Sequence, residues 1–328
     1  MRIGVRVAAT RGVARCLSTR ASAITAIEND GMKHCELPDG RLMEYADCGP
    51  ANGQPVLMLP GSGCTGAFYK HAGFEELFEQ HGVRVIAPSL ADHGLSDPPT
   101  ATGTDLITSS GHDCVAVMDH AGVSGAFMVT SWSLSSHTAL ELLAAHPERL
   151  RAALLTSPSA PLDVPGTSDD QIKFGNVIAT AAGGFMLYMR AGMPLIRRAQ
   201  TAAPEMKTAA AALLEHHPEE YDHYDDDVSR RALMRTWTPL LEYLRGCMQV
   251  KALGEAGLSE RLGGVHVPVL TCCDPDEGAA AEVPIAWLLG ALPNATRLPM
   301  PPSGVGHYHE AVPASMDLKL AALIAAAV

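Results

Sequence analysis

The stretch TSWSLSS, residues 130–136, decides how the rest of the chain is interpreted. It follows an apolar run, GAFMV, which predicts a buried strand, and it leads into SLSSHTALELLAAHPERL, whose pattern predicts a helix. A sharp strand-to-helix turn would place the Ser133 hydroxyl above a sheet, beside the backbone N–H groups of the new helix. A nucleophilic serine requires this arrangement. The motif has glycine two residues to either side, where this chain has Ser131 and Ser135.

Length and composition indicate a globular protein with a sizeable core. The chain has 328 residues, 47% of them hydrophobic and 18% charged. A net charge of -12 argues against nucleic acid or an anionic membrane as the main partner. No run reaches about 18 apolar residues, so we expect no membrane span. Eight cysteines without a C-x-x-C pair predict reduced thiols in a soluble intracellular protein.

The N-terminal segment has a different composition from the rest of the chain. Residues 1–27 contain five arginines and no acidic residue, with serine, threonine and alanine between them. This composition is typical of a transit peptide for a mitochondrion or plastid. The alternative is a disordered or wrongly assigned N-terminus. In either case we expect residues 1–31 to lie outside the fold, which would begin near Met32.

Beyond Met32, short apolar runs alternate with helical patterns. KHCEL and RLMEYADCG, on either side of a turn, predict an antiparallel hairpin. Further strands are expected at residues 55–59, 83–89 and 151–158 and in VHVPVLTCC and ATRLPM, and helices at residues 68–80, 104–120, 279–292 and 315–328. This alternation predicts a mostly parallel sheet with helices on both faces, an α/β fold.

The alternation is interrupted between residues 160 and 262, where we find only helical or loop patterns. We therefore expect a core formed by residues 32–159 and 263–328, with a helical lid at residues 160–262 across the active-site face. The segment VIATAAGGFMLYMRAGMPLI is apolar and rich in methionine and aromatic residues. Its composition fits helix packing, or a pocket for small apolar substrates.

A general base for Ser133 is expected in the loop that follows the last strand. GVGHYHE places His307 there, where it can reach the top of the sheet and accept the serine proton. His309 is the competing candidate.

The third member should be a carboxylate that orients the imidazole and stabilises its cation. The loop after VHVPVLTCC offers Asp274, Asp276 and Glu277. All three also fit solvated loop acids. We favour Asp276 over Asp274, because Asp276 lies further past the strand, where the chain can turn toward His307.

An oxyanion hole needs two N–H donors directed at the developing negative oxygen. The backbone N–H of Leu134, just after the nucleophile, is the first candidate. The second is the N–H of Ser62 in the turn PGSGC, where Gly61 and Gly63 would let the backbone approach the substrate.

The same turn matches G-x-G-x-x-G, a fingerprint for dinucleotide phosphates. A dinucleotide site also needs an acid at the end of the next strand, where this chain has Ser89, with Asp92 too late. That interpretation would leave the Ser133 turn unexplained, so we expect no dinucleotide.

A cluster of histidines and aspartates could in principle ligate a metal ion. Its spacing matches no metal motif and the segment is strongly polar, so a solvated acidic loop is expected and no metal. The adjacent Cys272 and Cys273 are expected in core packing. The cluster consists of His216, His217, His223, Asp225, Asp226 and Asp227.

With these pieces placed, residues 37–328 resemble the α/β-hydrolase superfamily, in its serine-nucleophile branch. The resemblance rests on the Ser133 turn, on the order Ser133, Asp276 and His307, and on VIAPSLADHGLSDPP, AAHPERL and LPNATRL. The chain departs from the family at the oxyanion loop, which begins Pro60-Gly61, and at Ser89, where the family often has aspartate. A serine nucleophile argues against the haloalkane dehalogenases and epoxide hydrolases.

The resemblance implies a serine hydrolase that cleaves a carboxylic ester or related acyl bond of a small apolar molecule, without metal or organic cofactor. Acyl transfer and cleavage of a carbon–carbon bond could use the same three residues. The altered turn and oxyanion loop also fit a non-catalytic binding protein of the same fold. The expected partner is a small-molecule substrate, with no nucleic acid and no membrane span; the oligomeric state cannot be predicted.

Overall fold

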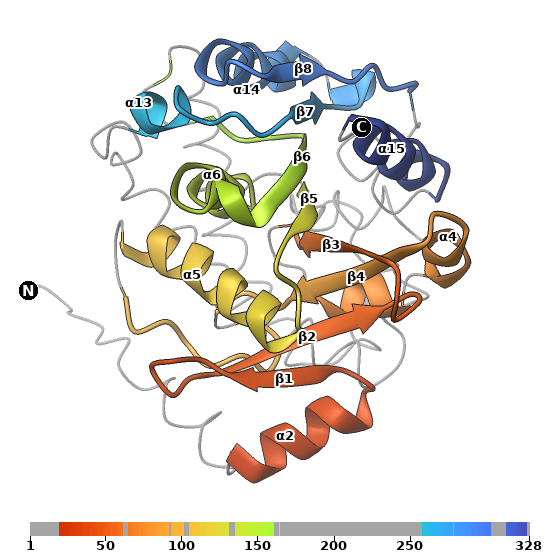
Figure 1. Cartoon of the computed structure of the whole chain (residues 1–328), viewed down its shortest axis with the longest axis vertical. Helices are drawn as coiled ribbons and strands as arrows, with labels where there is room; N and C mark the ends of the chain where they lie inside the picture. Colours follow the sequence, from red (N-terminus) through yellow and green to blue (C-terminus); the bar gives the residue numbers. More distant parts are fainter. Residues whose placement is uncertain are drawn as a thin grey trace, which may run out of the picture.

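A single eight-stranded sheet organises the described part of the chain (Figure 1). The computed structural model describes residues 20–61, 65–71, 73–91, 93–101, 105–130, 135–160, 164, 258–277, 279–302 and 313–326. The strands are β1 (Lys33–Glu36), β2 (Leu42–Cys48), β3 (Gln54–Leu59), β4 (Val83–Pro88), β5 (Ala126–Thr130), β6 (Leu150–Thr156), β7 (Val269–Cys272) and β8 (Ala295–Arg297). The helices are α2 (Arg20–Asn29), α3 (Ala67–His71), α4 (Glu75–Gln80), α5 (Asp105–His120), α6 (Ser135–Ala145), α13 (Leu258–Leu262), α14 (Ala279–Ala291) and α15 (Pro313–Ala326), with 3-10 turns η1 (Pro147–Arg149) and η3 (Pro275–Glu277).

The strand order is β1-β2-β4-β3-β5-β6-β7-β8. β1 and β2 form the predicted antiparallel hairpin, and β2 also pairs antiparallel with β4. Every pairing from β4 through β3 to β8 is parallel. The structure therefore confirms the predicted mostly parallel sheet. Because β4 and β5 lie on opposite sides of β3, the connections diverge at β3, and such a switch point is where open α/β sheets bind ligands.

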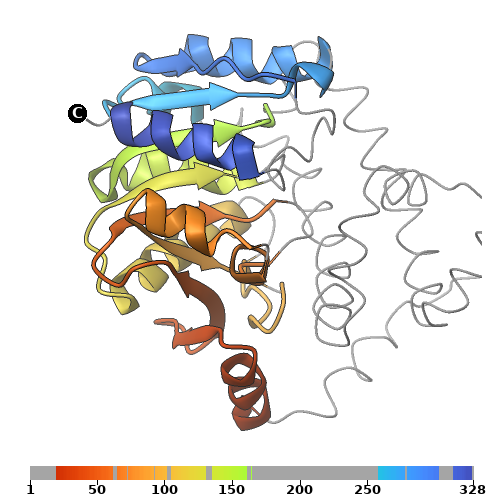
Figure 2. The same ribbon diagram turned by 90° about the vertical axis from the view of Figure 1, so that its right-hand side faces the viewer.

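Helices cover both faces of the sheet, as predicted. Figure 1 shows α5 and α6 on one face and α4 and α15 on the other, and the turned view in Figure 2 places α4 and α15 in front. Neighbouring strand residues belong to opposite cores: Leu57 packs with α5 and α6, whereas Val56 and Met58 pack with α4 and α15. Burial on both faces explains why the inner parallel strands are mostly apolar runs in the sequence, whereas the edge strand β8 is largely exposed.

The predicted helix at residues 68–80 is two helices, α3 and α4. Gly73 lies between them with a φ of 75°, in the left-handed region that favours glycine and that no helix interior can contain. Helical periodicity continues across this break, which is why the sequence pattern predicts one helix.

The folded part of the chain begins earlier than the expected Met32. α2 lies beyond β1 at one end of the sheet (Figure 2), and its Ile27 is fully buried in the core shared with α4 and α15. Arg20 fixes the start of this helix, because its guanidinium donates to Gly40 O and to Glu36 Oε2. Residues 20–31 of the expected leader are therefore part of the packed structure. Residues 1–19 lie outside the described part.

Truncating Ile27 tests whether α2 belongs to the cooperative fold. We expect Ile27→Ala to lower the free energy of unfolding by about 2–4 kcal/mol, because it removes a fully buried side chain and leaves a cavity. The exposed neighbour Glu28 gives a control, and Glu28→Ala should change it by less than about 0.5 kcal/mol. Denaturant unfolding of both variants measures this. Equal midpoints would mean that α2 does not contribute to the core.

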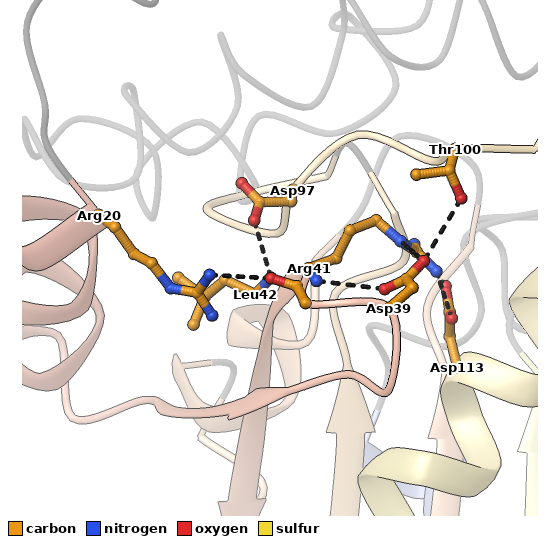
Figure 3. Close-up of polar contacts among 8 residues, drawn as sticks. Arg20, Asp39, Arg41, Leu42, Asp97, Thr100 and Asp113 are labelled. Atoms are coloured by element: carbon orange, nitrogen blue, oxygen red, sulfur yellow. Dashed lines mark hydrogen bonds and ion pairs between the residues drawn. The ribbon is translucent and has the colours of Figure 1, made fainter.

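A buried ion pair joins the opening hairpin to α5 (Figure 3). The Arg41 guanidinium donates to both carboxylate oxygens of Asp113, over 2.8 and 2.7 Å. Its Nε also donates to Asp39 Oδ2 at 2.7 Å, and Asp39 accepts from the Thr100 hydroxyl. Asp97 accepts the backbone N–H of Leu42 in the same region. This network holds the β1–β2 turn against the helix that precedes β5.

Among the described helices, none has the length and apolar character needed to cross a membrane. The end of the expected lid, α13, packs with the core, since Leu262 is fully buried among residues of α6 and α14. The remainder of the expected lid, apart from residues 160 and 164, lies outside the described residues, as does the His216–Asp227 cluster.

Candidate active site

The candidate site lies at the carboxyl edge of the parallel strands. The register pairs Leu59 of β3 with Thr130 of β5, and Thr156 of β6 with Cys272 of β7, so these strands end together. The loops after them therefore leave the sheet at one edge. In the sequence these loops carry the candidate nucleophile, acid and oxyanion residues, and the candidate base follows β8.

The structure describes the elements around Ser133 but not Ser133 itself. β5 ends at Thr130 and α6 begins at Ser135, as the sequence predicts for a sharp strand-to-helix turn. Ser135 is buried at the start of α6, although the motif has glycine there. Several predicted residues lie outside the described part, so their geometry stays a prediction: Ser62, Ser131, Ser133, Leu134, His307 and His309.

Hydroxyl groups connect the strand ends around this edge. Thr130 Oγ1 accepts the backbone N–H of Thr156 at 3.1 Å, which joins the ends of β5 and β6. Ser136 Oγ, in the first turn of α6, accepts the backbone N–H of Ser159 at 3.1 Å. Since buried N–H groups need partners, these bonds hold the chain after β6 against the start of the helix that follows Ser133.

The acidic turn after β7 meets the end of β6. Glu277 Oε1 accepts from the Ser157 hydroxyl at 2.5 Å and from the backbone N–H of Asp274 at 2.9 Å. Asp274 is almost fully buried, and Asp276 lies in the η3 turn between these two residues. The Glu277 carboxylate is therefore fixed at the carboxyl edge, between the ends of β6 and β7.

Ser157 has an unusual backbone conformation for a residue with a side chain. Its φ is 41°, in the left-handed region, and it follows the last residue of β6 directly. Such a conformation costs of order 1–3 kcal/mol and persists where surrounding contacts enforce it. Here the Ser157 N–H donates to Cys272 O and its hydroxyl donates to Glu277. The strain coincides with the contact that holds the Glu277 carboxylate.

A second buried carboxylate, that of Glu44, is connected through Ser89 to Gly66, just before α3. Glu44 of β2 accepts the hydroxyl of Ser89 at 2.6 Å, and Ser89 accepts the backbone N–H of Gly66 at 3.1 Å. Sequence reasoning did not select Glu44, because an acidic residue in a hairpin strand is usually on a solvated face. In the sequence, Ser89 stands out only as a position where a dinucleotide site or the family pattern would have an acid. No signal in a single sequence connects the two.

A buried imidazole lies one helical turn beyond Ser133. His137 is in the first turns of α6, and among the described residues its Nδ1 has no hydrogen-bond partner. Burial lowers the pKa of His137 from its ordinary 6.5 to about 4, because the charged form would be desolvated. His137 is therefore neutral at pH 7.

Acidification should destabilise the fold through His137. Because its folded pKa, about 4, lies below the unfolded value of 6.5, the unfolded chain binds more protons between these pH values. The free energy of unfolding should fall as pH drops through this window, with His137 contributing on the order of 3 kcal/mol. Unfolding midpoints measured across the window should have a shallower slope in His137→Gln. Parallel slopes for the two proteins would contradict a buried neutral imidazole.

The adjacent cysteines Cys272 and Cys273 are both buried, which confirms the expected core packing. Burial raises the pKa of the Cys273 thiol to about 11, so this thiol is protonated and unreactive at pH 7. Within the described ranges, no group of three or more His, Cys, Asp or Glu side chains could hold a metal ion.

Comparisons with known proteins agree with this architecture. A model of the alpha/beta hydrolase family matches residues 56–317. A non-heme chloroperoxidase of Streptomyces lividans is 31% identical over 126 residues, which is 38% of this chain and 44% of that protein. The match thus spans less than half of the curated relative's length.

Solved structures of several enzymes share the fold at low sequence identity. The enol-lactonase from Burkholderia xenovorans has a TM-score of 0.59 at 17% identity, covering 89% of this chain and 100% of that one. A thermophilic esterase from Thermogutta terrifontis has a TM-score of 0.58 at 18% identity, covering 90% of this chain and 98% of that one. The 2-hydroxy-6-oxo-6-phenylhexa-2,4-dienoate hydrolase from a Rhodococcus species has a TM-score of 0.58 at 16% identity, covering 90% and 99%.

Proposed function

Because the chain belongs to the alpha/beta hydrolase family, we propose that it is a serine hydrolase that cleaves a carboxylic ester or related acyl bond. The observation that supports the proposal is the order of elements around Ser133: in the sequence this serine falls between the end of a central parallel strand at Thr130 and the start of α6 at Ser135. A serine in that connection can combine a nucleophilic hydroxyl with N–H donors of the helix start.

In the proposed reaction His307 accepts the Ser133 proton while the serine oxygen attacks the substrate carbonyl. The backbone N–H groups of Ser62 and Leu134 stabilise the oxyanion, and the alcohol leaves with a proton from His307. The resulting acyl-enzyme is attacked by water, which gives its proton to His307. The acid is released and the serine is restored.

The proposed acid comes from the turn after β7. Asp276 is the sequence prediction, and it lies in η3 at the carboxyl edge. Glu277 competes with it, because its carboxylate is already held at that edge by Ser157 and by the Asp274 N–H. A carboxylate fixed in this way can orient an imidazole without reorganising during the reaction.

Neutralising each carboxylate distinguishes the two candidates. We expect Asp276→Asn to reduce kcat for ester hydrolysis by roughly 10⁴-fold, as removal of the orienting acid does in serine proteases. Glu277→Gln should then reduce kcat by less than about tenfold, since the amide oxygen can still accept the Ser157 hydroxyl. The reverse ranking in steady-state kinetics would assign the role to Glu277. Similar, small losses in both would contradict both assignments and leave Asp274, the third carboxylate of this loop, as the candidate acid.

The substrate is proposed to be small and apolar. The composition of residues 177–196 supports this, being apolar with methionine and aromatic residues. A series of nitrophenyl esters of increasing acyl length tests it, with the highest kcat/KM expected for a short uncharged acyl chain. A preference for a charged acyl group would overturn the assignment of substrate class.

Two other reactions could use the same residues. Transfer of the acyl group to an acceptor, and hydrolysis of a carbon–carbon bond, both proceed from attack at a carbonyl. The partial resemblance to a non-heme chloroperoxidase makes a reaction with hydrogen peroxide a third candidate. Product analysis of the same ester with added alcohol or hydrogen peroxide separates the first and third reactions from simple hydrolysis, and a diketone substrate tests cleavage of a carbon–carbon bond.

Pre-steady-state kinetics test the acyl-enzyme directly. Mixing the protein with a nitrophenyl ester whose acyl group leaves slowly should give a burst of nitrophenolate close to one equivalent per chain, followed by a slower steady rate. A non-catalytic binding protein of the same fold would give neither burst nor steady release. That result would overturn the proposed function.

A further inference from the structure

The carboxylate of Glu44 is the centre of a buried hydrogen-bonded group that joins four segments of the chain. Glu44 lies on β2, opposite the end of β4, where its backbone O accepts the Ser89 N–H. Both residues are buried, with Glu44 5% exposed and Ser89 fully enclosed. Burying a carboxylate costs free energy unless its oxygens accept hydrogen bonds. The groups that donate to Glu44 therefore identify the segments that this carboxylate positions.

The Glu44 oxygens bind two different segments. Oε1 accepts the Ser89 hydroxyl at 2.6 Å, and Oε2 accepts the backbone N–H of Leu95 at 3.1 Å. The Glu44 N–H donates to Ser96 Oγ, whose hydroxyl donates to Ser89 O. The carboxylate thus fixes the chain after β4 from both sides.

The carboxylate also determines the direction of the Ser89 hydroxyl. A hydroxyl has one proton, and here it is donated to Glu44 Oε1. The lone pairs of Ser89 Oγ are therefore left to accept the backbone N–H of Gly66 at 3.1 Å. Glu44 acts on Gly66 through this hydroxyl. Without an acceptor at Oε1, the hydroxyl would be free to rotate and to donate elsewhere.

Gly66 is held with very little space around it. A Cβ atom on Gly66 would lie 1.9 Å from Ala87 O, and a Cβ atom on Gly94 would lie 2.6 Å from Glu44 Oε1. The backbone at Gly66 therefore lies directly against β4, and the backbone at Gly94 lies directly against the Glu44 carboxylate. Gly66 begins the chain that enters α3, so the hydrogen bond from its N–H fixes the far end of the connection that leaves β3.

We propose that Glu44, acting through Ser89, is a positioning residue for the connection between β3 and α3. The inference rests on the proposed function, in which this connection supplies the Ser62 N–H to the oxyanion. In this role Glu44 makes no contact with the substrate. It holds Gly66, at the end of this connection, against β4. This contact matters for the reaction because an oxyanion donor displaced by about 1 Å can lower the rate by about 100-fold.

Two variants of the group and one matched control test the proposal. Glu44→Ala removes the acceptor, and Ser89→Ala removes the group between it and Gly66. Asp47→Asn is the control, because Asp47 is a buried carboxylate on the same strand that pairs with Arg84 and Lys33 instead. The measurements are kcat and KM for a nitrophenyl ester, and amide hydrogen exchange of Gly66, with amides of β5 as an internal reference.

Glu44→Ala and Ser89→Ala are each expected to lower kcat by about 10- to 100-fold with KM changed less than about threefold. Exchange at the Gly66 amide should accelerate by at least about tenfold while β5 stays protected. Asp47→Asn should change neither quantity by more than about twofold. In the double variant Glu44→Ala/Ser89→Asp, the new carboxylate can accept the Gly66 N–H directly, so part of both losses should be recovered.

The two readouts separate failure of this inference from failure of the proposed function. Unchanged exchange at Gly66 in Glu44→Ala would overturn the inference, as would faster exchange with unchanged kcat, or an equal fall in kcat in Asp47→Asn. A wild-type protein without ester turnover would overturn the proposed function alone. Exchange at Gly66 would then still decide whether Glu44 holds the connection.

Discussion

Replacing Ser133 with alanine is expected to reduce kcat/KM for a small apolar ester by about 10⁴- to 10⁶-fold. The nucleophile, base and acid act as a unit, so losing the hydroxyl removes the acyl-enzyme route rather than one contribution to it. Residual hydrolysis would come from substrate binding and the oxyanion donors alone. Steady-state kinetics with the preferred ester measures the loss.

A serine at the opposite end of the same strand, β5, provides the control. Ser124 is exposed and precedes β5 at the opposite end from Ser133. Ser124→Ala should retain wild-type kcat/KM within about twofold. Both variants should unfold at the wild-type denaturant concentration. A Ser133→Ala protein that kept a tenth or more of the activity would contradict the assignment of the nucleophile.

The second large effect concerns stability. We expect Arg41→Met to lower the free energy of unfolding by about 3–5 kcal/mol, because it leaves the buried carboxylate of Asp113 without its bidentate partner. Burial already raises the pKa of Asp113, against the opposing effect of the Arg41 guanidinium. Without Arg41 that carboxyl would have to take up a proton or bring water into the core. Denaturant unfolding at pH 7 measures the loss.

A double variant shows whether the loss comes from the stranded charge. Arg41→Met/Asp113→Leu removes both ions and fills the space with apolar atoms, which is often neutral for a buried pair. We therefore expect it to recover most of the stability lost in Arg41→Met. If the double variant were as unstable as the single one, the pair itself, rather than the unpaired carboxylate, would account for the effect.

The fold could be predicted because its signal is local. The inner parallel strands, β3 to β7, are largely buried on both faces, so each is a short, mostly apolar run in the sequence, and each helix between them has its own periodicity. The mostly parallel order follows from this alternation. The flanks of Ser133 were predicted for the same reason, since Thr130 ends an apolar run and Ser135 begins a helical one.

Features that depend on tertiary contacts were not predicted. The arginine-rich composition around α2 suggests a segment outside the fold, yet Ile27 is buried in a core cluster that also contains residues of β2 and α4. The break between α3 and α4 depends on the positive φ of Gly73, which helical periodicity does not reveal. In each case a long-range contact or a backbone angle decides the outcome.

The candidate site was predicted in outline only. Chain order identifies a serine, a histidine and an acidic turn, but Asp274, Asp276 and Glu277 are neighbours and look alike in the sequence. The structure adds that Glu277 is held by Ser157, across 120 positions of sequence. It also adds Glu44, whose carboxylate accepts the Ser89 hydroxyl. The family often has aspartate at the position of Ser89, and here the adjacent strand β2 supplies a carboxylate at that place.

Covalent labelling shows whether Ser133 is the reactive nucleophile. The protein is treated with a fluorophosphonate probe, digested, and the modified peptide is identified by mass spectrometry. We expect one adduct per chain, on Ser133, and no adduct in Ser133→Ala. An adduct on a different residue, or an unmodified wild-type protein that nonetheless hydrolyses esters, would contradict the assignment of Ser133 as the nucleophile.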